Sequence, residues 1–575
     1  MKSLISTILC LFALSWSLCA SGYRVAIIPV EFSDVAFDDK AGNVDNKINR
    51  AQIYFNDQFY PHRSFSFELL PTVRLPRNQA WYGANSTSRK DERIDQAVRE
   101  ACSLLDRDLS VYDNNKDGFI DNICIITAGG SEAGGDGVNC IWPQQGYLHD
   151  RGGTSSVNGK TVDCFTICPE KSPLGVFCHE FAHSLGLQDL YDTDGNGSGG
   201  TSKGLWGTLS LMDLGLDNDG GNTPPNFCAI ELEQLGIGSP VEMTDGNITL
   251  HPVSSSKEYL RLESDVANEY FLLECRDEKG WDAFTGVSGL LVYHIDRSAN
   301  NSWYSDFYKC NLSASERWAY NQVNCRPDYQ CAKIVEAVPN AASIASVSFP
   351  QPGRSSFCSD TDPAFKFWSG TTSSQAIIDI RKNSDRSVSF KVITPIKILD
   401  ISVFQDAAIF RWTTSESLKV KECELSCSPY SGTAISDART SISAGDSIFA
   451  ATLECLSPST SYRAVIKAVC EDGSIYSETV NFITKSIQKG ARPFIYLNTP
   501  CRLDNGFFQK DSYLPLRVNN AMEARKIEWF FNEERIEPDG SGYWHLKESG
   551  TLKAKLWYED GSADVIIKQI TVVHE

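Results

Sequence analysis

The chain has 575 residues, of which 42% are hydrophobic and 11% aromatic, enough apolar material for several packed cores and too much for a disordered chain. Its formal net charge of −20 argues against nucleic acid or an anionic membrane as a partner. From the length we expect about three or four domains.

The first residues are typical of a secretory signal peptide. An apolar run from Leu4 to Leu18 is followed by small residues, so we expect residues 1–20 to be removed on export. Cys19 raises the alternative of a lipidated cysteine that anchors the chain to a membrane, but the preceding Trp16-Ser17-Leu18 lacks the small residue that such a site needs. No later run has the roughly 18 apolar residues that span a bilayer. We therefore predict a secreted or extracellular protein, with attachment to the cell surface left open.

Residues 21–245 alternate strand-like and helix-like patterns, as an α/β domain does. The apolar run Arg24–Phe32 predicts a buried strand, and Asn122–Ala128 predicts another. Apolar residues recur at helical spacing over 46–58 and 91–105.

An acidic loop precedes the second of these strands. The run Asp113–Asp121 places oxygen side chains at loop positions one, three, five and nine and a glycine at position six, as calcium loops do. The twelfth position is Cys124 instead of a bidentate glutamate, so a calcium ion would need an acid from elsewhere. Against the alternative of a polar surface turn, the sequence predicts calcium with the ligands Asp113, Asn115, Asp117 and Asp121.

A second run, Asp192–Gly197, opens in the same way. Lys203 stands where the closing glutamate would be, so a calcium loop and a merely flexible loop both stay open.

The most informative stretch is HEFAHSLGLQD, from His179 to Asp189. On a helix, the i,i+4 spacing puts the imidazoles of His179 and His183 on one face, where they can converge on one cation. Glu180 then lies beside the metal and suits a general base that takes a proton from a metal-activated water. Gly186 lets the chain leave the helix with a positive φ and offer Asp189 as a third ligand. The sequence therefore predicts a zinc site with the fourth position open to water.

The ends of the motif helix, the third metal ligand and the role of His294 need separate consideration. We expect the motif helix to begin near Ser172-Pro173 and to run to Ser184. Asp192 is an alternative third ligand, and so is a glutamate of the helix predicted over 224–236, either Glu231 or Glu233. His294 could stabilise an oxyanion, but a lone histidine beside Asp296 on a strand end favours a structural role.

The remaining sequence is rich in strand signals. Short alternating runs predict a β-rich extension over 246–395. Residues 396–486 resemble a fibronectin type III sandwich, with Trp412 on an early strand and a tyrosine-corner pattern over Leu456–Tyr462. Residues 487–575 carry strand signals that suggest an immunoglobulin-like sandwich, in Ile527–Phe531 and Thr551–Trp557.

Nineteen cysteines raise the question of disulfides, which export permits. Two lie in the predicted signal peptide, which leaves an odd number, and Cys178 beside His179 is a candidate for a free thiol packed in the core. Local pairs are conceivable where cysteines are close in sequence, namely Cys164 with Cys168, Cys325 with Cys331 and Cys423 with Cys427.

Several of these blocks together resemble the immune-inhibitor-A-like metallopeptidases, a family of secreted bacterial zinc proteases with a metzincin-like catalytic domain. The resemblance covers roughly 24–395 and rests on His179–Asp192, the Asp113–Asp121 loop, Trp206–Met212, and Gly280-Trp281-Asp282 leading into Leu291–Asp296. It implies an α/β zincin fold in which Met212 packs beneath the metal ligands.

The resemblance also implies roles for individual residues. It assigns His179, His183 and Asp189 to zinc and Glu180 to the general base. Gln188 stands where many relatives have proline. No long propeptide separates the first strand from the signal peptide, so the means of keeping the enzyme inactive is open.

The sequence thus predicts a multidomain protein with an α/β zincin catalytic domain, a β-rich extension and two all-β sandwich domains. The predicted function is that of a secreted zinc endopeptidase with calcium as a second cofactor, acting on proteins or peptides, extracellular glycoproteins among them. The alternative is an inactive, adhesin-like protein that binds through its β-sandwich domains, although the intact Glu180 argues against it. The oligomeric state stays open.

Overall fold

The structure is a computed structural model whose described chain divides into two compact units. The first comprises the described residues of Met1–Thr244, Thr249–Arg354 and Arg381–Ser389, and the second those of Asp245–Ile248, Ser355–Ile380 and Phe390–Glu575. Most of the predicted extension therefore packs in one unit with the motif helix, and the predicted signal peptide lies outside the described residues. These are 22–38, 43–87, 89–242, 246–264, 266–430, 440–445, 448–486, 492–497, 502–503, 506–521, 523–539 and 542–573.

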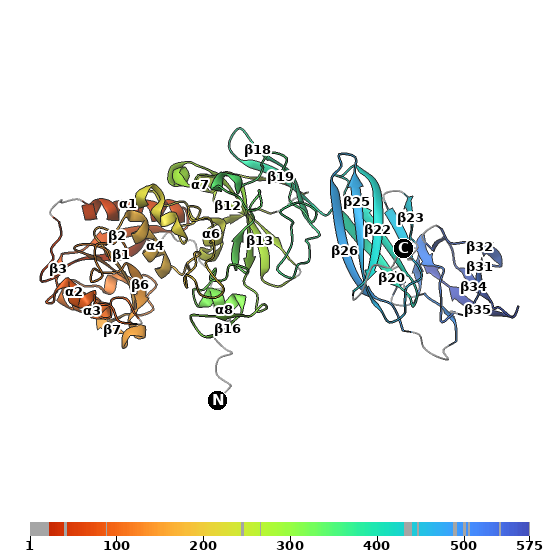
Figure 1. The fold of residues 1–575 in the computed structure, drawn as a ribbon, viewed down its shortest axis with the longest axis horizontal. Coiled ribbons are helices and arrows are strands. Elements are labelled where there is room, and N and C mark those ends of the chain that lie inside the picture. The colour runs from red at the N-terminus through yellow and green to blue at the C-terminus, as the bar shows by residue number, and fades with distance from the viewer. Residues whose placement is uncertain are drawn as a thin grey trace, which may run out of the picture. The chain divides into compact units, whose positions relative to one another are not determined.

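The first unit is built on a six-stranded sheet in the order β2-β1-β5-β9-β6, with β3 also on β1 (Figure 1). All its neighbours pair in parallel except β6, which runs antiparallel to β9 and forms an edge. The strands predicted at 24–32 and 122–128 are β1 and β5. The strands are β1 Gly22–Glu31, β2 Ser64–Leu69, β3 Val73–Arg74, β5 Ile123–Thr127, β6 Gln144–Tyr147 and β9 Cys164–Pro169.

Alternate residues of β1 face two different cores, because successive side chains of a strand point to opposite faces. Val25 and Ile27 pack in the core that contains α1 and α4, whereas Ala26 and Ile28 pack in the core of α3. Helices therefore cover both faces of the sheet, as in other α/β domains. The helices and remaining short strands of this part are α1 Asn43–Phe59, α2 Gln79–Tyr82, α3 Ile94–Leu104, η1 Ser110–Tyr112, η2 Leu148–Arg151, α4 Leu174–Ser184, β4 Phe119–Ile120, β7 Ser155–Val157 and β8 Lys160–Val162.

The helix predicted over 224–236 is shorter in the structure. It is α6, Ala229–Leu235, because Pro224-Pro225 precedes it and Cys228 provides its N-terminal cap. Gly236 ends it as predicted, in the left-handed conformation at φ 65°.

The extension forms a five-stranded sheet in the order β10-β12-β13-β14-β17. Its strands are β10 Ser239–Pro240, β12 Glu258–Glu263, β13 Glu269–Asp277, β14 Ser288–Asp296 and β17 Ala332–Ile334. Two short helices, η3 Leu214–Asp217 and α5 Asn218–Gly221, precede this sheet in the chain. The elements between its strands are β11 Asn247–Leu250, α7 Val253–Ser256, η4 Gly280–Phe284, β15 Trp303–Ser305, β16 Cys310–Leu312 and α8 Ala314–Ala319. After β17 come η5 Ile344–Ser346, β18 Ala376–Lys382 and β19 Val388–Ile393.

Beyond residue 395, all helices and strands of the described chain are β strands, without a helix among them. Trp412 is fully buried, and the hydroxyl of Tyr462 accepts a hydrogen bond from the Ser457 amide at 2.8 Å, which is the contact that a tyrosine corner makes. The strands are β20 Ile396–Val403, β21 Ala408–Thr414, β22 Val420–Pro429, β23 Thr440–Gly445, β24 Ile448–Leu453, β25 Ser461–Cys470, β26 Ile475–Ile483, β27 Phe494–Ile495, β28 Phe508–Gln509, β29 Ser512–Pro515, β30 Val518–Asn519, β31 Lys526–Phe531, β32 Glu534–Ile536, β33 Tyr543–Leu546, β34 Gly550–Trp557, β35 Ala563–Ile570 and β36 Val572–Val573.

Two of the three suggested local disulfides are wrong, and the third, Cys325 with Cys331, is not formed in the structure. All cysteines of the described residues are free thiols. Cys164 and Cys168 lie four residues apart on β9, as Cys423 and Cys427 do on β22, which separates each pair by about 13 Å, far beyond the reach of a disulfide. Cys178 is buried in the core, as expected.

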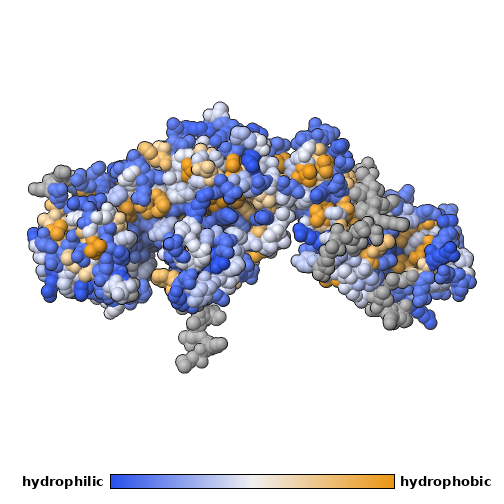
Figure 2. Space-filling model, in the orientation of Figure 1, coloured by the Kyte–Doolittle hydropathy of each residue, from blue (hydrophilic) through white to orange (hydrophobic). Residues whose placement is uncertain are grey.

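The surface is mostly hydrophilic on the face drawn in Figure 2, where the hydrophobic residues of the described chain form small, separate patches. No described helix combines the length and the apolar character that crossing a bilayer requires.

Candidate metal centre

The motif lies on α4, which spans Leu174–Ser184 and so confirms the predicted helix. Proline at position 173 caps its start, and its apolar residues pack against the sheet in the same core as α1. The helix thus fixes His179, Glu180 and His183 relative to a rigid scaffold.

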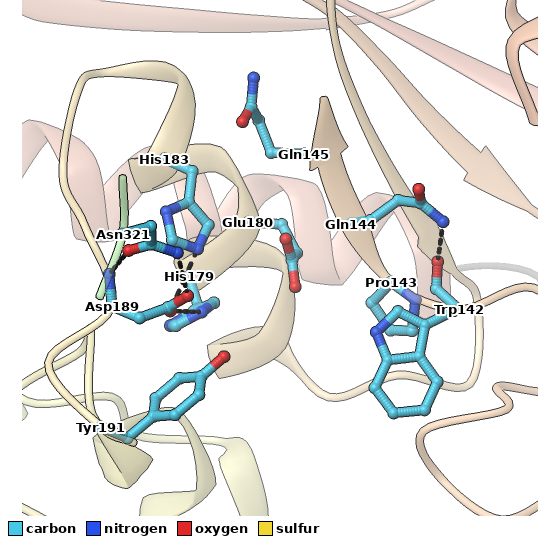
Figure 3. Close-up of a pocket in the computed structure, with 10 residues that line it drawn as sticks. All are labelled: Trp142, Pro143, Gln144, Gln145, His179, Glu180, His183, Asp189, Tyr191 and Asn321. Carbon is cyan, nitrogen blue, oxygen red and sulfur yellow. Dashed lines mark hydrogen bonds and ion pairs between the residues drawn. The ribbon is translucent and has the colours of Figure 1, made fainter. Parts of the chain in front are cut away.

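Three acceptor atoms converge at the end of this helix (Figure 3). The Nε2 atoms of His179 and His183 lie 3.1 and 3.3 Å from Oδ1 of Asp189. Among the described residues, these three side chains form one of two groups whose ligand atoms could hold a metal ion. The structure therefore brings together the two histidines and the aspartate that the sequence singled out.

Backbone carbonyls fix which ring nitrogen of each histidine faces the site. Nδ1 of His179 lies 2.9 Å from the Leu211 carbonyl, and Nδ1 of His183 lies 2.8 Å from the Leu187 carbonyl. Because a carbonyl can only accept, each Nδ1 carries a proton and donates it. In the neutral rings both Nε2 atoms then have free lone pairs, as metal ligands need.

Asp189 is held by a turn and by a distant asparagine. Gly186 adopts φ 104°, so the chain turns back after the helix as predicted. The side chain of Asn321 donates from Nδ2 to Oδ2 of Asp189 at 2.6 Å and accepts the Asp189 amide on Oδ1 at 2.7 Å. This reciprocal pair leaves Oδ1 of Asp189 pointing at the histidines.

The donor set fits zinc. Oδ1 of Asp189 is buried and, apart from its ion-pair contacts with the two Nε2 atoms, has no hydrogen-bond partner. Ligand atoms of a tetrahedral zinc with bonds of about 2.0–2.1 Å are about 3.3–3.4 Å apart, close to the separations found here. Two imidazoles and a carboxylate are also a ligand set that catalytic zinc uses.

Electrostatics couple the three side chains. Burial opposes charge on His183, but the carboxylate of Asp189 outweighs it and raises the pKa of His183 to about 9. Burial likewise works against ionisation of Asp189, yet the two histidines hold the pKa of Asp189 well below its usual range. A cation that binds here must displace the proton from His183, so binding weakens as the pH falls.

Glu180 faces a cavity of about 250 Å³ beside the three side chains. Burial raises the pKa of Glu180. The opposite wall is the approach to β6, from Trp142 to Gln145, and the hydroxyl of Tyr191 points into the cavity from the side of Asp189 (Figure 3).

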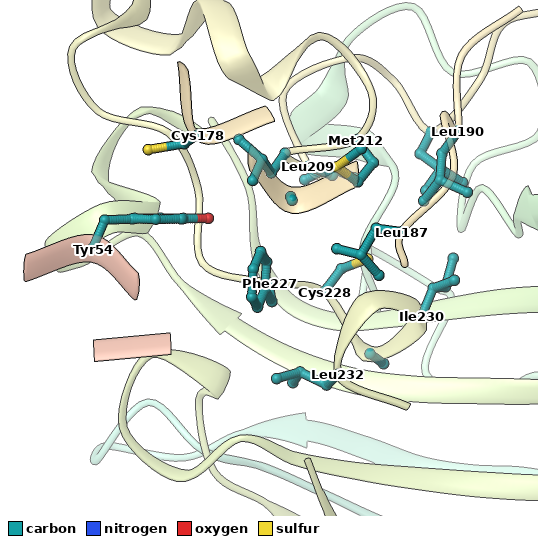
Figure 4. Close-up of a cluster of buried hydrophobic side chains, with 14 of the residues drawn as sticks. Tyr54, Cys178, Leu187, Leu190, Leu209, Met212, Phe227, Cys228, Ile230 and Leu232 are labelled. Atoms are coloured by element: carbon teal, nitrogen blue, oxygen red, sulfur yellow. The ribbon is translucent and has the colours of Figure 1, made fainter. Parts of the chain in front are cut away.

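A packed turn contacts the segments that carry the site, and Figure 4 shows its Met212 in a buried hydrophobic cluster with Leu187 and Leu190. Met212 is fully buried in one core with Leu187 and Leu190, and its carbonyl accepts the Leu190 amide at 2.7 Å. Since the preceding residue, Leu211, holds His179, the turn positions both the helix and the Asp189 loop.

The alternative ligands are occupied elsewhere. Glu231 is buried and accepts hydrogen bonds from the Ser210 hydroxyl and the Met212 and Cys228 amides. Glu233 pairs with Arg261 and Tyr270, and Asp192 accepts the amides of its own loop. His294 lies 2.8 Å from Glu269 and stacks on Phe271, a structural role.

The two predicted calcium loops differ in the contacts of their acidic side chains. In the first, Lys160 forms an ion pair with Asp113 at 2.7 Å, Asn115 donates to Asp117, and Asp121 accepts from Asn114. This loop belongs to neither of the two metal-like groups of the described residues, so calcium there stays a prediction.

The second loop supplies the other metal-like group, Asp192 and Asp194 with Cys325. The sulfur is a poor ligand for calcium, which prefers oxygen. Calcium at this loop also stays a prediction.

Six residues that line the cavity were not predicted to take part: Trp142, Pro143, Gln144, Gln145, Tyr191 and Asn321. Tyr191 lies inside the motif block, so its place was visible but not its direction. Asn321 is 132 residues from Asp189, and nothing in its local pattern signals the contact.

Replacing Asn321 with alanine tests the outer support of the site. We expect zinc affinity to fall by about 10- to 100-fold, because losing the partner of a ligating carboxylate typically has that effect. Competition with a chromogenic chelator measures it. Gln322→Ala is the matched control, since its amide contacts Thr193 and Ser305 instead of Asp189. An equal loss in both variants would contradict the role of Asn321.

A buried aspartate behind the opposite wall gives a pH prediction. Oδ2 of Asp91 accepts the Trp142 amide and the Gln144 side chain, both at 2.8 Å, and burial raises the pKa of Asp91 to about 7. The unfolded chain loses this proton near pH 4, so the free energy of unfolding falls as the pH rises from about 4 to 7. Asparagine at this position carries no such penalty. We therefore expect the difference in melting temperature between Asp91→Asn and the wild type to shift in favour of the variant as the pH rises from 5 to 8. A difference that does not change with pH would refute this prediction.

Two histidines and a carboxylate on a short helix and turn, with a glutamate in a cleft beside an edge strand, are the arrangement expected of a metallopeptidase catalytic domain. Residues 23–234 match the family model described as the Immune inhibitor A peptidase M6 catalytic domain. The resemblance seen in the sequence is thereby confirmed.

Two named relatives are similar to part of this chain. The chain is 33% identical over 204 residues to the pre-pro-metalloprotease PrtV of Vibrio cholerae, covering 30% of this chain and 22% of PrtV. It is 29% identical over 214 residues to Immune inhibitor A of Bacillus thuringiensis subsp. alesti, covering 32% and 31%. The chain thus spans less than a third of the length of these relatives.

Among solved structures, matches include tandem immunoglobulin modules. The match to the Ig1-2 module of the Drosophila receptor protein tyrosine phosphatase DLAR covers 31% of this chain and 100% of that module, at 11% identity and a TM-score of 0.15. Murine CEACAM1b is also covered completely, at 9% identity and a TM-score of 0.12. At these scores the likeness carries no argument about the fold.

Proposed function

We propose that this protein is a secreted zinc-dependent endopeptidase that cleaves extracellular proteins, with His179, His183 and Asp189 as the zinc ligands and Glu180 as the general base. The observation that carries the proposal is the convergence of three lone-pair donors on one point, next to the half-buried Glu180. When bound, zinc would supply Lewis acidity that lowers the pKa of water and polarises a carbonyl.

The chain's own residues account for the remaining steps. An extended substrate can add to the free edge of β6 by backbone hydrogen bonds, as peptides do at exposed sheet edges. This would lay a scissile carbonyl across the cavity in front of Glu180. Glu180 takes a proton from the attacking water and later delivers it to the leaving amine. We assign to the Tyr191 hydroxyl, which points into the cavity, the donation of a hydrogen bond to the oxygen that gains charge.

The architecture that we propose around this site follows the sequence. The parallel sheet with one antiparallel edge, the motif helix and the buried methionine turn support a metzincin-like fold for 21–245 with the extension 246–395. Trp412 and the Tyr462 contact support a fibronectin type III-like sandwich over 396–486, followed by an immunoglobulin-like one over 487–575. Residues 1–20 support export by a signal peptide.

The test uses the protein purified from culture medium. We expect one zinc per chain, cleavage of casein, loss of cleavage with 1,10-phenanthroline and recovery with added zinc. Zinc binding without cleavage of any protein tested, together with tight binding of the uncut proteins, would favour the adhesin-like alternative.

A further inference from the structure

Three aromatic side chains of the extension are exposed together, although burying them would be favourable. Phe307 is 65% exposed, Tyr308 42% and Tyr320 49%; we call them the aromatic cluster. The rings of Phe307 and Tyr308 are 4.9 Å apart, and those of Tyr308 and Tyr320 are 5.1 Å apart. Contiguous exposed apolar surface of this kind typically marks a binding site.

The aromatic cluster lies beside the metal centre. The Tyr308 hydroxyl donates to the Tyr320 carbonyl at 3.4 Å, and the next residue, Asn321, lines the cavity and holds Asp189. Strands β15 and β16 form a hairpin whose loop carries Phe307 and Tyr308. A second link joins this hairpin to the loop that follows Asp189, because the Ser198 amide donates a hydrogen bond to Asp306 at 2.6 Å. The cluster is therefore linked to the site through the neighbouring residues Tyr320 and Asn321 and through the Ser198 contact.

The rings are also held in place. Ser305, at the start of the loop that carries Phe307 and Tyr308, is fully buried and donates to Gln322 at 3.0 Å. Aromatic rings have few rotatable bonds, so a fixed loop presents them at a small cost in conformational entropy. Such rings suit the binding of apolar side chains.

The cavity itself offers little of this chemistry. Apart from Trp142 and Pro143, its lining is polar or charged, including Gln144, Gln145 and Glu180. Apolar residues of a substrate must therefore find most of their contacts outside the cavity.

We propose that the aromatic cluster is a substrate-binding surface, which takes apolar or aromatic side chains of an extended polypeptide at a distance from the bond that is cut. The proposal rests on the proposed function, because the occupant is the polypeptide whose scissile bond lies at the metal centre. Long polypeptides gain affinity from it, whereas a short peptide that fills only the cavity does not.

Binding is measured directly, without cleavage. In the Glu180→Ala background, the dissociation constant of fluorescein-labelled casein is compared between the intact aromatic cluster and Phe307→Ser/Tyr308→Ser. We expect binding about 5- to 20-fold weaker, as two exposed aromatic contacts would give. Tyr308→Phe keeps the ring and should bind like the parent, and Phe119→Ser, which removes a 45% exposed phenylalanine elsewhere in the same unit, should have no effect.

Activity then separates this inference from the proposed function. With an active protein, the double variant should raise KM for casein by a similar factor, leave kcat within about two-fold, and leave a fluorogenic hexapeptide unaffected. Unchanged casein binding, or an equal loss with the hexapeptide, overturns the inference. A wild type that cleaves neither substrate overturns the proposed function, while the binding comparison still decides whether the aromatic cluster holds polypeptides.

Discussion

Replacing Glu180 with glutamine is expected to lower kcat by about 10²- to 10⁴-fold, the range that a general base contributes. Glutamine keeps the shape and the burial of the side chain but cannot accept a proton from water at neutral pH. Zinc content should stay at one per chain, because Glu180 is not among the converging ligand atoms.

The measurement is the initial rate of casein and peptide cleavage at a known zinc content. Glu92→Gln is the matched control, since Glu92 is an exposed glutamate outside the cavity lining. Activity of Glu180→Gln equal to that of the wild type would show that another group activates the water.

Replacing Asp189 with alanine is expected to remove zinc from the protein. Asp189 supplies the buried oxygen that completes the set, and it is the carboxylate that the histidines face. The loss of affinity should exceed the about 10- to 100-fold loss expected for Asn321→Ala, because a direct ligand is lost instead of its support. Zinc content after dialysis against a weak chelator, measured by mass spectrometry, shows it.

A comparison variant decides between the aspartates. Asp192→Ala should keep its zinc, since the Asp192 carboxylate accepts the amides of its own loop. If Asp192→Ala lost zinc and Asp189→Ala kept it, the third ligand would be assigned wrongly.

The local part of the site could be predicted from the sequence because its geometry is local. The i,i+4 spacing of His179 and His183, the glycine turn and Asp189 all lie within eleven residues of one helix and its exit, where backbone rules decide the positions. The buried strands β1 and β5 were predictable for the same reason, since a continuous apolar run is typical of a strand covered on both faces.

The support of the site could not be predicted, because it depends on contacts between distant segments. Asn321 reaches Asp189 across 132 residues, and Asp91 holds Trp142 across 51. Strand β6 has the sequence QQGY, which carries no strand signal, and it forms because β9 offers it a partner. The suggested pairs Cys164 with Cys168 and Cys423 with Cys427 failed because proximity in sequence, along an extended strand, means separation in space.

The central claim is that two imidazoles and one carboxylate hold a zinc ion at the end of α4. Diffraction from crystals of the wild-type protein, recorded on both sides of the zinc absorption edge, tests it most directly. We expect one strong anomalous peak about 2.0–2.2 Å from Nε2 of His179, Nε2 of His183 and Oδ1 of Asp189. No peak at that point after soaking in zinc, or a peak held by other side chains, would contradict the account.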